Sequence, residues 1–123
     1  MSKYYNQKTT INGIVFDSRK EARRWTELTL LLKAGQIKDL QRQVKFVLIP
    51  AQYQDVQVTD KKGKTKTKSV LVERECSYIA DFMYFDIDKG IIAVEDTKGL
   101  KTKEYIIKRK LMRYLKNIAI TEV

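Results

Sequence analysis

The chain has 123 residues, a length that fits one folded domain with its own core. Its 25 Lys+Arg outnumber its 15 Asp+Glu and give a formal net charge of +10, which favours a polyanionic partner. There is no histidine and a single cysteine, Cys76, which excludes histidine-based catalysis, histidine-ligated zinc and a disulfide framework within the chain.

The sequence also bears on the compartment. No apolar run approaches the ~18–20 residues of a membrane-spanning helix. Residues Met1 to Lys8 are polar and lack the apolar core of a secretion signal. We therefore expect a protein of the reduced cytoplasm with no membrane partner.

The first predicted elements are a short hairpin and a helix. An Asn-Gly pair lies between β-prone runs at about residues 8–16, which is typical of a tight hairpin turn. Ser18 is a suitable N-cap and Gly35 a suitable C-terminal stop. The sequence therefore predicts a helix over residues 18–34.

The middle of the chain is predicted to be rich in strands. A strand over residues 43–49 ends at Pro50, the only proline. Residues 52–59 and 69–76 resemble the arms of a further hairpin, whose tip at residues 60–69 holds five lysines. Such a tip is either a solvated loop that protects a sheet edge or an arm that follows a DNA backbone.

The last third predicts two strands, a helix and a short strand. The strands Tyr78–Asp86 and Ile91–Thr97 flank a turn at residues 88–90, and a helix runs from about 102 to 116. Residues 118–123 form a last short strand. The order α-β-β-β-α-β predicts an α/β fold with a mixed β-sheet flanked by helices.

The hairpin of residues 78–97 carries the residues most suggestive of chemistry. With a two-residue loop, Asp81 lies directly opposite Asp96. Lys98 then shares a face with Asp96, whereas Glu95 and Thr97 point to the other face. A three-residue loop would shift the pairing by one position and would need a bulge to restore it.

Two opposed carboxylates need compensation. At ~4 Å and an effective dielectric of about 20, their repulsion is about 4 kcal/mol. A proton, a lysine or a bound metal can relieve it. Since a chain without histidine offers mainly oxygen ligands, a metal held here would be Mg²⁺ or Mn²⁺.

Glu21 is a third candidate carboxylate. On a helical wheel Trp25, Leu28 and Leu32 lie within about 40° of it, so Glu21 should face the sheet. Ser18 and Glu21 also fit a capping box, in which the glutamate returns to the N-cap amide. Both alternatives stay open, because an acidic side chain in the first helical turn is favourable in either.

The last helix adds a candidate binding surface. Its apolar stripe is expected to comprise Ile107, Leu111, Tyr114 and Ile118, with a cationic face opposite. Such a face is either solubilising or a track for phosphates. The candidate nucleic-acid-binding residues, there and in the lysine-rich tip, are Lys101, Lys103, Tyr105, Arg109, Arg113, Lys116, Lys61, Lys62, Lys64 and Lys66.

At Asp81, Asp96 and Lys98 the chain resembles the PD-(D/E)xK nuclease superfamily, whose fold is restriction-endonuclease-like. The family pattern is an Asp at the end of one strand, then an acidic residue, any residue and Lys on the next. Glu21 matches the Glu of the preceding helix. Two departures are Ala80, where the family usually has Pro, and Asp96, where Glu is commoner.

The resemblance extends over about residues 16–116. It includes Phe-Asp-Ser-Arg-Lys-Glu-Ala and Glu-Asp-Thr-Lys-Gly, which are similar to small phage-encoded members of uncharacterised function. It implies a Mg²⁺-dependent (or Mn²⁺-dependent) DNA endonuclease of a phage or prophage, acting in the bacterial host cell on branched or junction DNA, with a homodimer as a candidate assembly. The alternative is a non-catalytic nucleic-acid-binding module that retains the nuclease fold.

The resemblance also implies a role for each site residue. Asp81, Asp96 and Glu21 would hold the metal, helped by the backbone carbonyl of Thr97. The metal would polarise the scissile phosphate and lower the pKa of an attacking water. Lys98 would orient or deprotonate that water and offset charge in the transition state.

Overall fold

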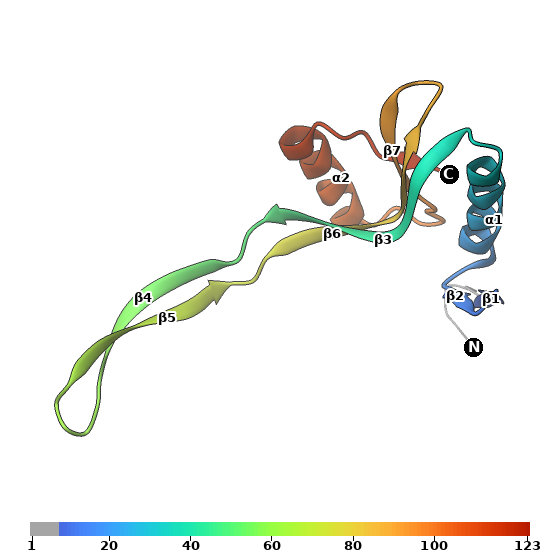
Figure 1. Cartoon of the computed structure of the whole chain (residues 1–123). Helices are drawn as coiled ribbons and strands as arrows, with labels where there is room; N and C mark the ends of the chain where they lie inside the picture. The colour runs from blue at the N-terminus through green and yellow to red at the C-terminus, as the bar shows by residue number, and fades with distance from the viewer. Residues whose placement is uncertain (1–7) are drawn as a thin grey trace.

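The computed structural model describes residues 8–123, which form a mixed sheet, two helices and two separate hairpins (Figure 1). The central sheet has the order β3-β6-β7-β8, in which β8 runs parallel to β7 and the other neighbours are antiparallel. The expected mixed α/β fold is therefore confirmed. The elements in chain order are β1 (Thr9–Ile11), β2 (Ile14–Phe16), α1 (Arg19–Lys33), β3 (Ile37–Ile49), β4 (Gln52–Thr59), β5 (Thr65–Glu73), β6 (Cys76–Asp86), β7 (Ile91–Asp96), α2 (Lys103–Lys116) and β8 (Thr121–Glu122).

Local signals account for the first hairpin and the first helix. Asn12 and Gly13 have φ values of 50° and 81°, and a two-residue type I′ turn needs two such positive values. The Ser18 hydroxyl accepts a hydrogen bond from the Glu21 amide, and Gly35 follows the helix with φ 74°. Both predicted elements are confirmed.

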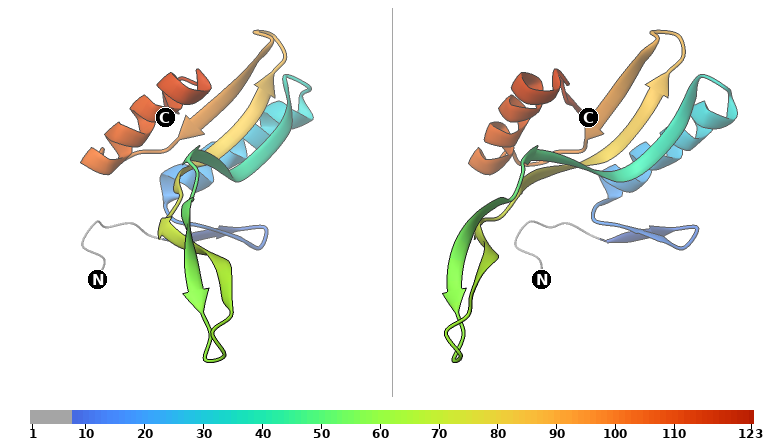
Figure 2. Two further views of the ribbon diagram at one scale, coloured as in Figure 1. Left: turned by 90° about the vertical axis from the view of Figure 1, so that its left-hand side faces the viewer. Right: turned by 60° about the vertical axis from the view of Figure 1, so that its left-hand side comes forward.

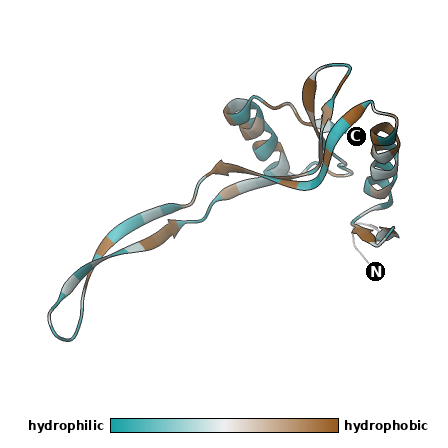
Figure 3. Ribbon diagram, viewed as in Figure 1, coloured by the Kyte–Doolittle hydropathy of each residue, from teal (hydrophilic) through white to brown (hydrophobic). Residues whose placement is uncertain are grey.

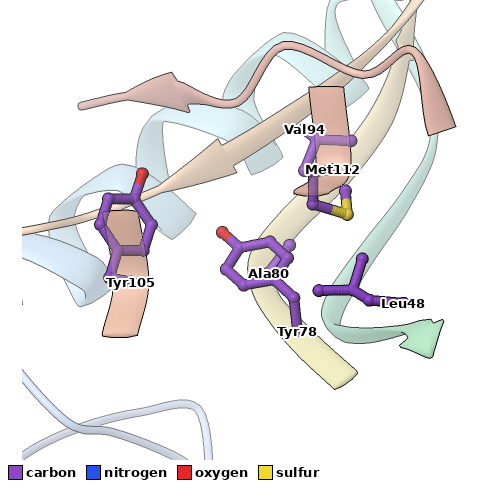
Figure 4. Packing of buried hydrophobic residues seen from close by; sticks show 6 residues of the cluster. All are labelled: Leu48, Tyr78, Ala80, Val94, Tyr105 and Met112. Atoms are coloured by element: carbon purple, nitrogen blue, oxygen red, sulfur yellow. The ribbon is translucent and has the colours of Figure 1, made fainter. Parts of the chain in front are cut away.

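The two helices cover opposite faces of the central sheet. Leu28 of α1 is fully buried in one core, and Met112 of α2 is fully buried in the other. Ala93 packs against the α1 core, whereas its neighbour Val94 belongs to the α2 core, as alternation along a strand requires. Figure 4 shows the side chains of the α2 core, in which Tyr105 and Met112 of the helix meet residues of the sheet such as Tyr78 and Val94.

The stripe expected on the last helix is wrong at two of its four positions, while Leu111 and Ile118 pack against the α2 core as expected. Two of its residues are exposed, Ile107 by 58% and Tyr114 by 86%. The fully buried positions are Tyr105 and Met112 instead. Apolar residues surround this helix on several sides, so periodicity alone could not select the face that meets the sheet. Tyr105, expected on the nucleic-acid-binding face, therefore lies in the core.

Several strand boundaries also differ from expectation. β3 begins at Ile37, six residues before the predicted strand, and β8 is limited to Thr121–Glu122. The loop expected at 60–69 is a turn at residues 60–64, because the following Thr and Lys residues pair with β4. Threonine favours strands, and lysines are tolerated where the strand faces solvent. Lys66 and Lys68 therefore belong to β5.

β4 and β5 form an arm that projects from the body of the molecule (Figures 1 and 2). The arm continues the ribbon of β3 and β6, and every residue of its two strands is exposed except Val56. Figure 3 shows hydrophobic and hydrophilic residues interspersed along it.

Within residues 8–123, neither helix is long and apolar enough to cross a membrane. The expectation about a secretion signal rests mainly on residues 1–7, which lie outside the described part of the chain. Cys76 is present as a free thiol.

Candidate metal and nucleic-acid site

The candidate site lies where the central sheet changes its buried side. Ala80 packs in the α2 core and Phe82 in the α1 core, although residues two apart in a regular strand share a face. β3 pairs with β6 on both sides of this point, so Gln43 faces Asp81. Gln43 has φ 52°, a left-handed conformation that is costly for a residue with a side chain. Strain of this kind is concentrated at functional sites.

The predicted register of the hairpin formed by β6 and β7 is confirmed. Phe82 pairs with Glu95, and one further step along both strands brings Asp81 opposite Asp96. The strands are joined by a four-residue turn at residues 87–90, rather than by the two-residue loop expected, but the pairing is the same. The two aspartates therefore meet across β6 and β7.

Asp81 is held by three donors. Its Oδ2 accepts hydrogen bonds of 2.8 Å from both the amide and the hydroxyl of Thr97. Its Oδ1 lies 3.5 Å from the Gln43 side-chain amide. The expectation that Thr97 points to the other face is therefore wrong, because Thr97 lies beyond the end of β7, where strand alternation no longer applies, and its hydroxyl contacts Asp81. The role expected for its carbonyl stays a prediction.

Glu21 reaches the same place from the first turn of α1. Its side chain is 3% exposed, and its Oε1 accepts a 3.0 Å hydrogen bond from the same Gln43 amide. The Arg42 guanidinium lies 3.8 Å from that oxygen. Burial, and then repulsion from Asp81, raise the pKa of Glu21. The backbone amide of Glu21 donates to the Ser18 hydroxyl, whereas its carboxylate faces Gln43 and Arg42 of β3. The return of the glutamate side chain to the N-cap amide stays a prediction.

Asp96 is the most buried of the three carboxylates, with 1% exposure. Its Oδ2 accepts a hydrogen bond from the Tyr78 hydroxyl, and its Oδ1 lies 3.5 Å from the Lys98 ammonium. Burial raises the pKa of Asp96 to about 6, and Asp81 adds to the rise, while Tyr78 and Lys98 oppose it. Burial and the bond to Asp96 also raise the pKa of Tyr78.

Lys98 lies at the edge of an open depression. Its ammonium is 4.8 Å from the centre of the Tyr105 ring, a cation–π distance. Among residues 8–123, the buried Tyr105 hydroxyl has no hydrogen-bond partner of ordinary geometry. Burial and the nearby Glu122 raise the pKa of Tyr105. The depression has a volume of about 360 Å³ and is lined by Ser77, Tyr78, Ile79, Lys98, Thr102, Glu104, Tyr105 and Lys108.

Glu95 belongs to a different network on the other face. Arg24 donates two 2.7 Å hydrogen bonds to its carboxylate, and Tyr84 donates another. The bonds to Glu95 raise the pKa of Arg24, and burial and Glu95 raise the pKa of Tyr84 to about 12. Glu95 therefore points away from Asp96, as expected, and is committed to a structural ion pair.

The three candidate carboxylates are connected through Asp81, which repels both Glu21 and Asp96. All their donor atoms are oxygens, which suits Mg²⁺ or Mn²⁺. Among residues 8–123, no three acidic or cysteine side chains are close enough to be a ready coordination site. Gln43, Thr97, Tyr78 and Lys98 occupy the carboxylate oxygens instead.

The chain matches a family model described as "Protein of unknown function (DUF1064)" over residues 1–121. It belongs to this family. Comparisons with curated proteins and with solved structures gave no match.

In this DUF1064 chain the predicted cations of α2 fall into two groups. Lys101 and Arg109 are 3.3 and 3.5 Å from Glu122, which partly neutralises them. Lys103, Arg113 and Lys116 are exposed. A second depression, of about 560 Å³, is lined by Arg109, Lys110, Arg113, Tyr114, Ala119 and Ile120.

Sequence reasoning missed the residues that orient the carboxylates. Gln43 donates to Glu21 and lies beside Asp81, and Tyr78 donates to Asp96. A glutamine in a predicted strand carries no local signal of a positive φ. Tyr78 stood in an apolar run, where burial was the only expectation. Lys110 and Tyr114 at the second depression were also missed.

Proposed function

We propose that the chain is a Mg²⁺- or Mn²⁺-dependent endonuclease that hydrolyses phosphodiester bonds in DNA. The observation that carries the proposal is the position of the Asp81 carboxylate, which shares the Gln43 amide with the buried Glu21 and lies next to the buried Asp96 across β6 and β7. Burying acids close together is costly unless a cation compensates them. A protein that only bound phosphate would gain nothing from this arrangement.

The order of the elements supports the proposal. With the two hairpins set aside, the chain runs α1-β3-β6-β7-α2-β8, which matches the order expected for the PD-(D/E)xK nuclease superfamily. Asp96 ends β7 and Lys98 follows it, in agreement with the family motif, whereas Asp81 lies in the middle of β6 and not at its end. We therefore extend the proposal to a restriction-endonuclease-like core.

Glu21, Asp81 and Asp96 would hold the metal, with the Thr97 carbonyl as a further oxygen. When bound, Mg²⁺ would polarise the scissile phosphate and lower the pKa of an attacking water. The amide and hydroxyl of Thr97 hold Asp81 Oδ2, whereas Oδ1 has only the longer 3.5 Å contact with the Gln43 amide and would be the oxygen that takes a ligand. Gln43, between Asp81 and Glu21, would act as a positioning residue for both.

Lys98 would orient or deprotonate the attacking water and offset charge in the transition state. Its ammonium is held between Asp96 and the Tyr105 ring, beside the open depression. Tyr78 holds one oxygen of Asp96, so the other faces Lys98. Hydrolysis by an activated water needs no covalent protein intermediate, which fits a chain without a histidine-activated nucleophile.

The resemblance to small phage-encoded proteins extends the proposal to its setting. Branched or junction DNA is the proposed substrate class, and the cytoplasm of the bacterial host is the proposed location. A homodimer is the proposed assembly, because cutting two strands requires two sites. The exposed cations Lys103, Arg113 and Lys116 would contact phosphates beside the site.

One assay tests the proposal. The full-length protein is incubated with linear, single-stranded and four-way-junction DNA in Mg²⁺, Mn²⁺ or EDTA. Wild type should cut in the presence of metal, while Asp81→Ala and Lys98→Ala should bind without cutting. Asp55→Ala, which removes an exposed carboxylate of the arm, is the matched control and should cut normally.

Binding without cutting in any metal would favour the second candidate, a non-catalytic nucleic-acid-binding module. The observation that favours this candidate is the occupation of Asp81 Oδ2 by two hydrogen bonds. In that case Asp81 and Thr97 would be a structural pair that ties β6 to the chain after β7.

A further inference from the structure

The arm formed by β4 and β5 is the largest feature that the proposed catalytic site does not use. Its strands pair with each other along their whole length and lie away from the helices (Figure 2). The eight residues of β4 span about 26 Å. A two-stranded ribbon in water is marginally stable by itself, so an arm of this length is typical of a binding element.

The pairing gives the arm two different faces. Directly opposed residues of an antiparallel pair share a face. Val56 lies opposite Lys68, and Val58 lies opposite Lys66. With Val70, these residues form what we name the Lys–Val face.

The other side, which we name the polar face, alternates with the Lys–Val face. Gln57 lies opposite Thr67 and Thr59 opposite Thr65. The Gln57 amide donates to the Thr67 hydroxyl at 3.1 Å, and the two threonine hydroxyls lie 3.2 Å apart. These four polar side chains thus form hydrogen bonds with one another in pairs.

The lysines of the arm, in contrast, have no such partners within the arm. Residues 52–73 contain five lysines and three carboxylates, those of Asp55, Asp60 and Glu73. Asp60 Oδ1 accepts 2.9 Å hydrogen bonds from the amides of Lys62 and Lys64, which hold it in the turn. Within residues 8–123, none of these five lysines forms an ion pair. The arm therefore presents uncompensated positive charge to an external anion.

We infer that the Lys–Val face of the arm binds the sugar–phosphate backbone of duplex DNA beside the cleavage site. This inference rests on the proposed function for the position of the cut. Lys66 and Lys68 lie two residues apart, about 7 Å along one strand of the arm, and would contact phosphates. Val56 and Val58, which lie opposite these lysines, would contact the sugars.

The composition of the arm favours duplex over single-stranded DNA. Proteins that bind single strands stack the bases on aromatic side chains. The Lys–Val face has no aromatic residue, since the one aromatic side chain of the two strands, Tyr53, pairs with Leu71 on the polar face. A duplex keeps its bases stacked and presents only its backbone to such a surface. The length of β4 corresponds to about 8 base pairs at ~3.4 Å each.

The test compares the two faces of the same ribbon. Binding of the full-length protein to a labelled duplex of about 30 base pairs is measured in EDTA, between about 50 and 200 mM salt. Lys66→Gln/Lys68→Gln should weaken binding about 10-fold or more and lower the salt slope by about 2. The matched control is Gln57→Ala/Thr67→Ala, which should leave affinity and slope unchanged. Equal losses in both variants, or no loss in either, would overturn the inference.

Two competing ligands separate the possible anions. A single strand of the same length should bind more weakly than the duplex, and the lysine variant should change its affinity less. Vesicles of equimolar phosphatidylserine and phosphatidylcholine should not bind detectably at the same salt. Preference for the single strand or for the vesicles would overturn the inference.

The outcome is independent of catalysis because EDTA prevents metal-dependent cutting. If wild type cuts DNA in Mg²⁺ but the lysine variant binds duplex normally, the inference about the arm fails and the proposed nuclease stands. If nothing cuts but duplex binding depends on Lys66 and Lys68, the nuclease proposal fails and the arm retains its ligand.

Discussion

The body of the molecule buries charged side chains beside hydrogen-bond donors, whereas its arm leaves charged side chains exposed. In the body, Glu21, Glu95 and Asp96 are at most 3% exposed, and each accepts a hydrogen bond from a neighbouring side chain. In the arm, Lys66 and Lys68 are exposed and, among residues 8–123, have no carboxylate partner. A buried charge needs a defined partner, whereas an exposed one keeps its hydration. The body can therefore fix individual atoms for chemistry, and the arm can only offer a charged surface.

The largest effect should come from removing a carboxylate of the candidate site. Asp81→Asn keeps the size of the side chain but removes the charge between Glu21 and Asp96. We expect metal-dependent cleavage to fall ~10³-fold, since such a loss removes charge stabilisation at the reacting phosphate. Single-turnover cleavage measures it. Asp55→Asn on the arm is the control, and a comparable loss there would remove the distinction between the two regions.

The next largest effect concerns the structural ion pair of the body. Arg24→Ala leaves Glu95 buried without the two hydrogen bonds from Arg24. We therefore expect the free energy of unfolding to fall by about 3–5 kcal/mol. Urea unfolding measures the change. The exposed neighbour gives the control, because Arg23→Ala should cost less than about 0.5 kcal/mol. An equal cost for both would mean that the ion pair contributes nothing specific.

The pH dependence of stability should identify Asp96. Burial raises the pKa of Asp96 from 3.8 to about 6 in the folded protein. Because the folded state holds this proton more tightly, the resulting stabilisation is full below about pH 4 and is lost as pH rises through about 6. We expect a loss on the order of 3 kcal/mol.

The measurement is the unfolding free energy of wild type minus that of Asp96→Asn, in EDTA, across this pH range. The difference should fall as pH rises, since asparagine does not titrate. A flat difference would contradict the raised pKa.

A smaller effect should distinguish backbone strain from side-chain positioning at Gln43. Glycine tolerates the positive φ, so Gln43→Gly should be more stable than Gln43→Ala by about 1 kcal/mol. Both variants lose the amide that donates to Glu21, so both should cut DNA more slowly than wild type by a similar factor. Normal cleavage by Gln43→Gly would show that the side chain does not position the carboxylates.

The smallest effect on stability should come from the arm. Lys66→Gln/Lys68→Gln breaks no ion pair within the described residues. The free energy of unfolding, measured with urea, should therefore change by less than about 0.5 kcal/mol. The same variant should lose duplex affinity. A large loss of stability would mean that these lysines act within the fold, as the charges of the body do.

The sequence by itself determined the features that depend on near neighbours. The Asn-Gly turn and the limits of α1 follow from turn and cap residues. The meeting of Asp81 with Asp96 follows from strand alternation and pairing about a short turn. Their opposition, and the separation of Glu95 from them, were therefore predictable.

Tertiary structure alone decided the features that depend on distant partners. Packing against the sheet selected Tyr105 and Met112 of α2 for burial, although the helix is apolar on several sides. Pairing with β4 drew Lys66 and Lys68 into a strand. The positive φ of Gln43, whose side chain lies between Glu21 and Asp81, costs conformational energy locally and persists only because the surrounding structure holds it. Local preferences are weak beside such long-range packing, so the carboxylate pair could be predicted from the sequence and its supporting residues could not.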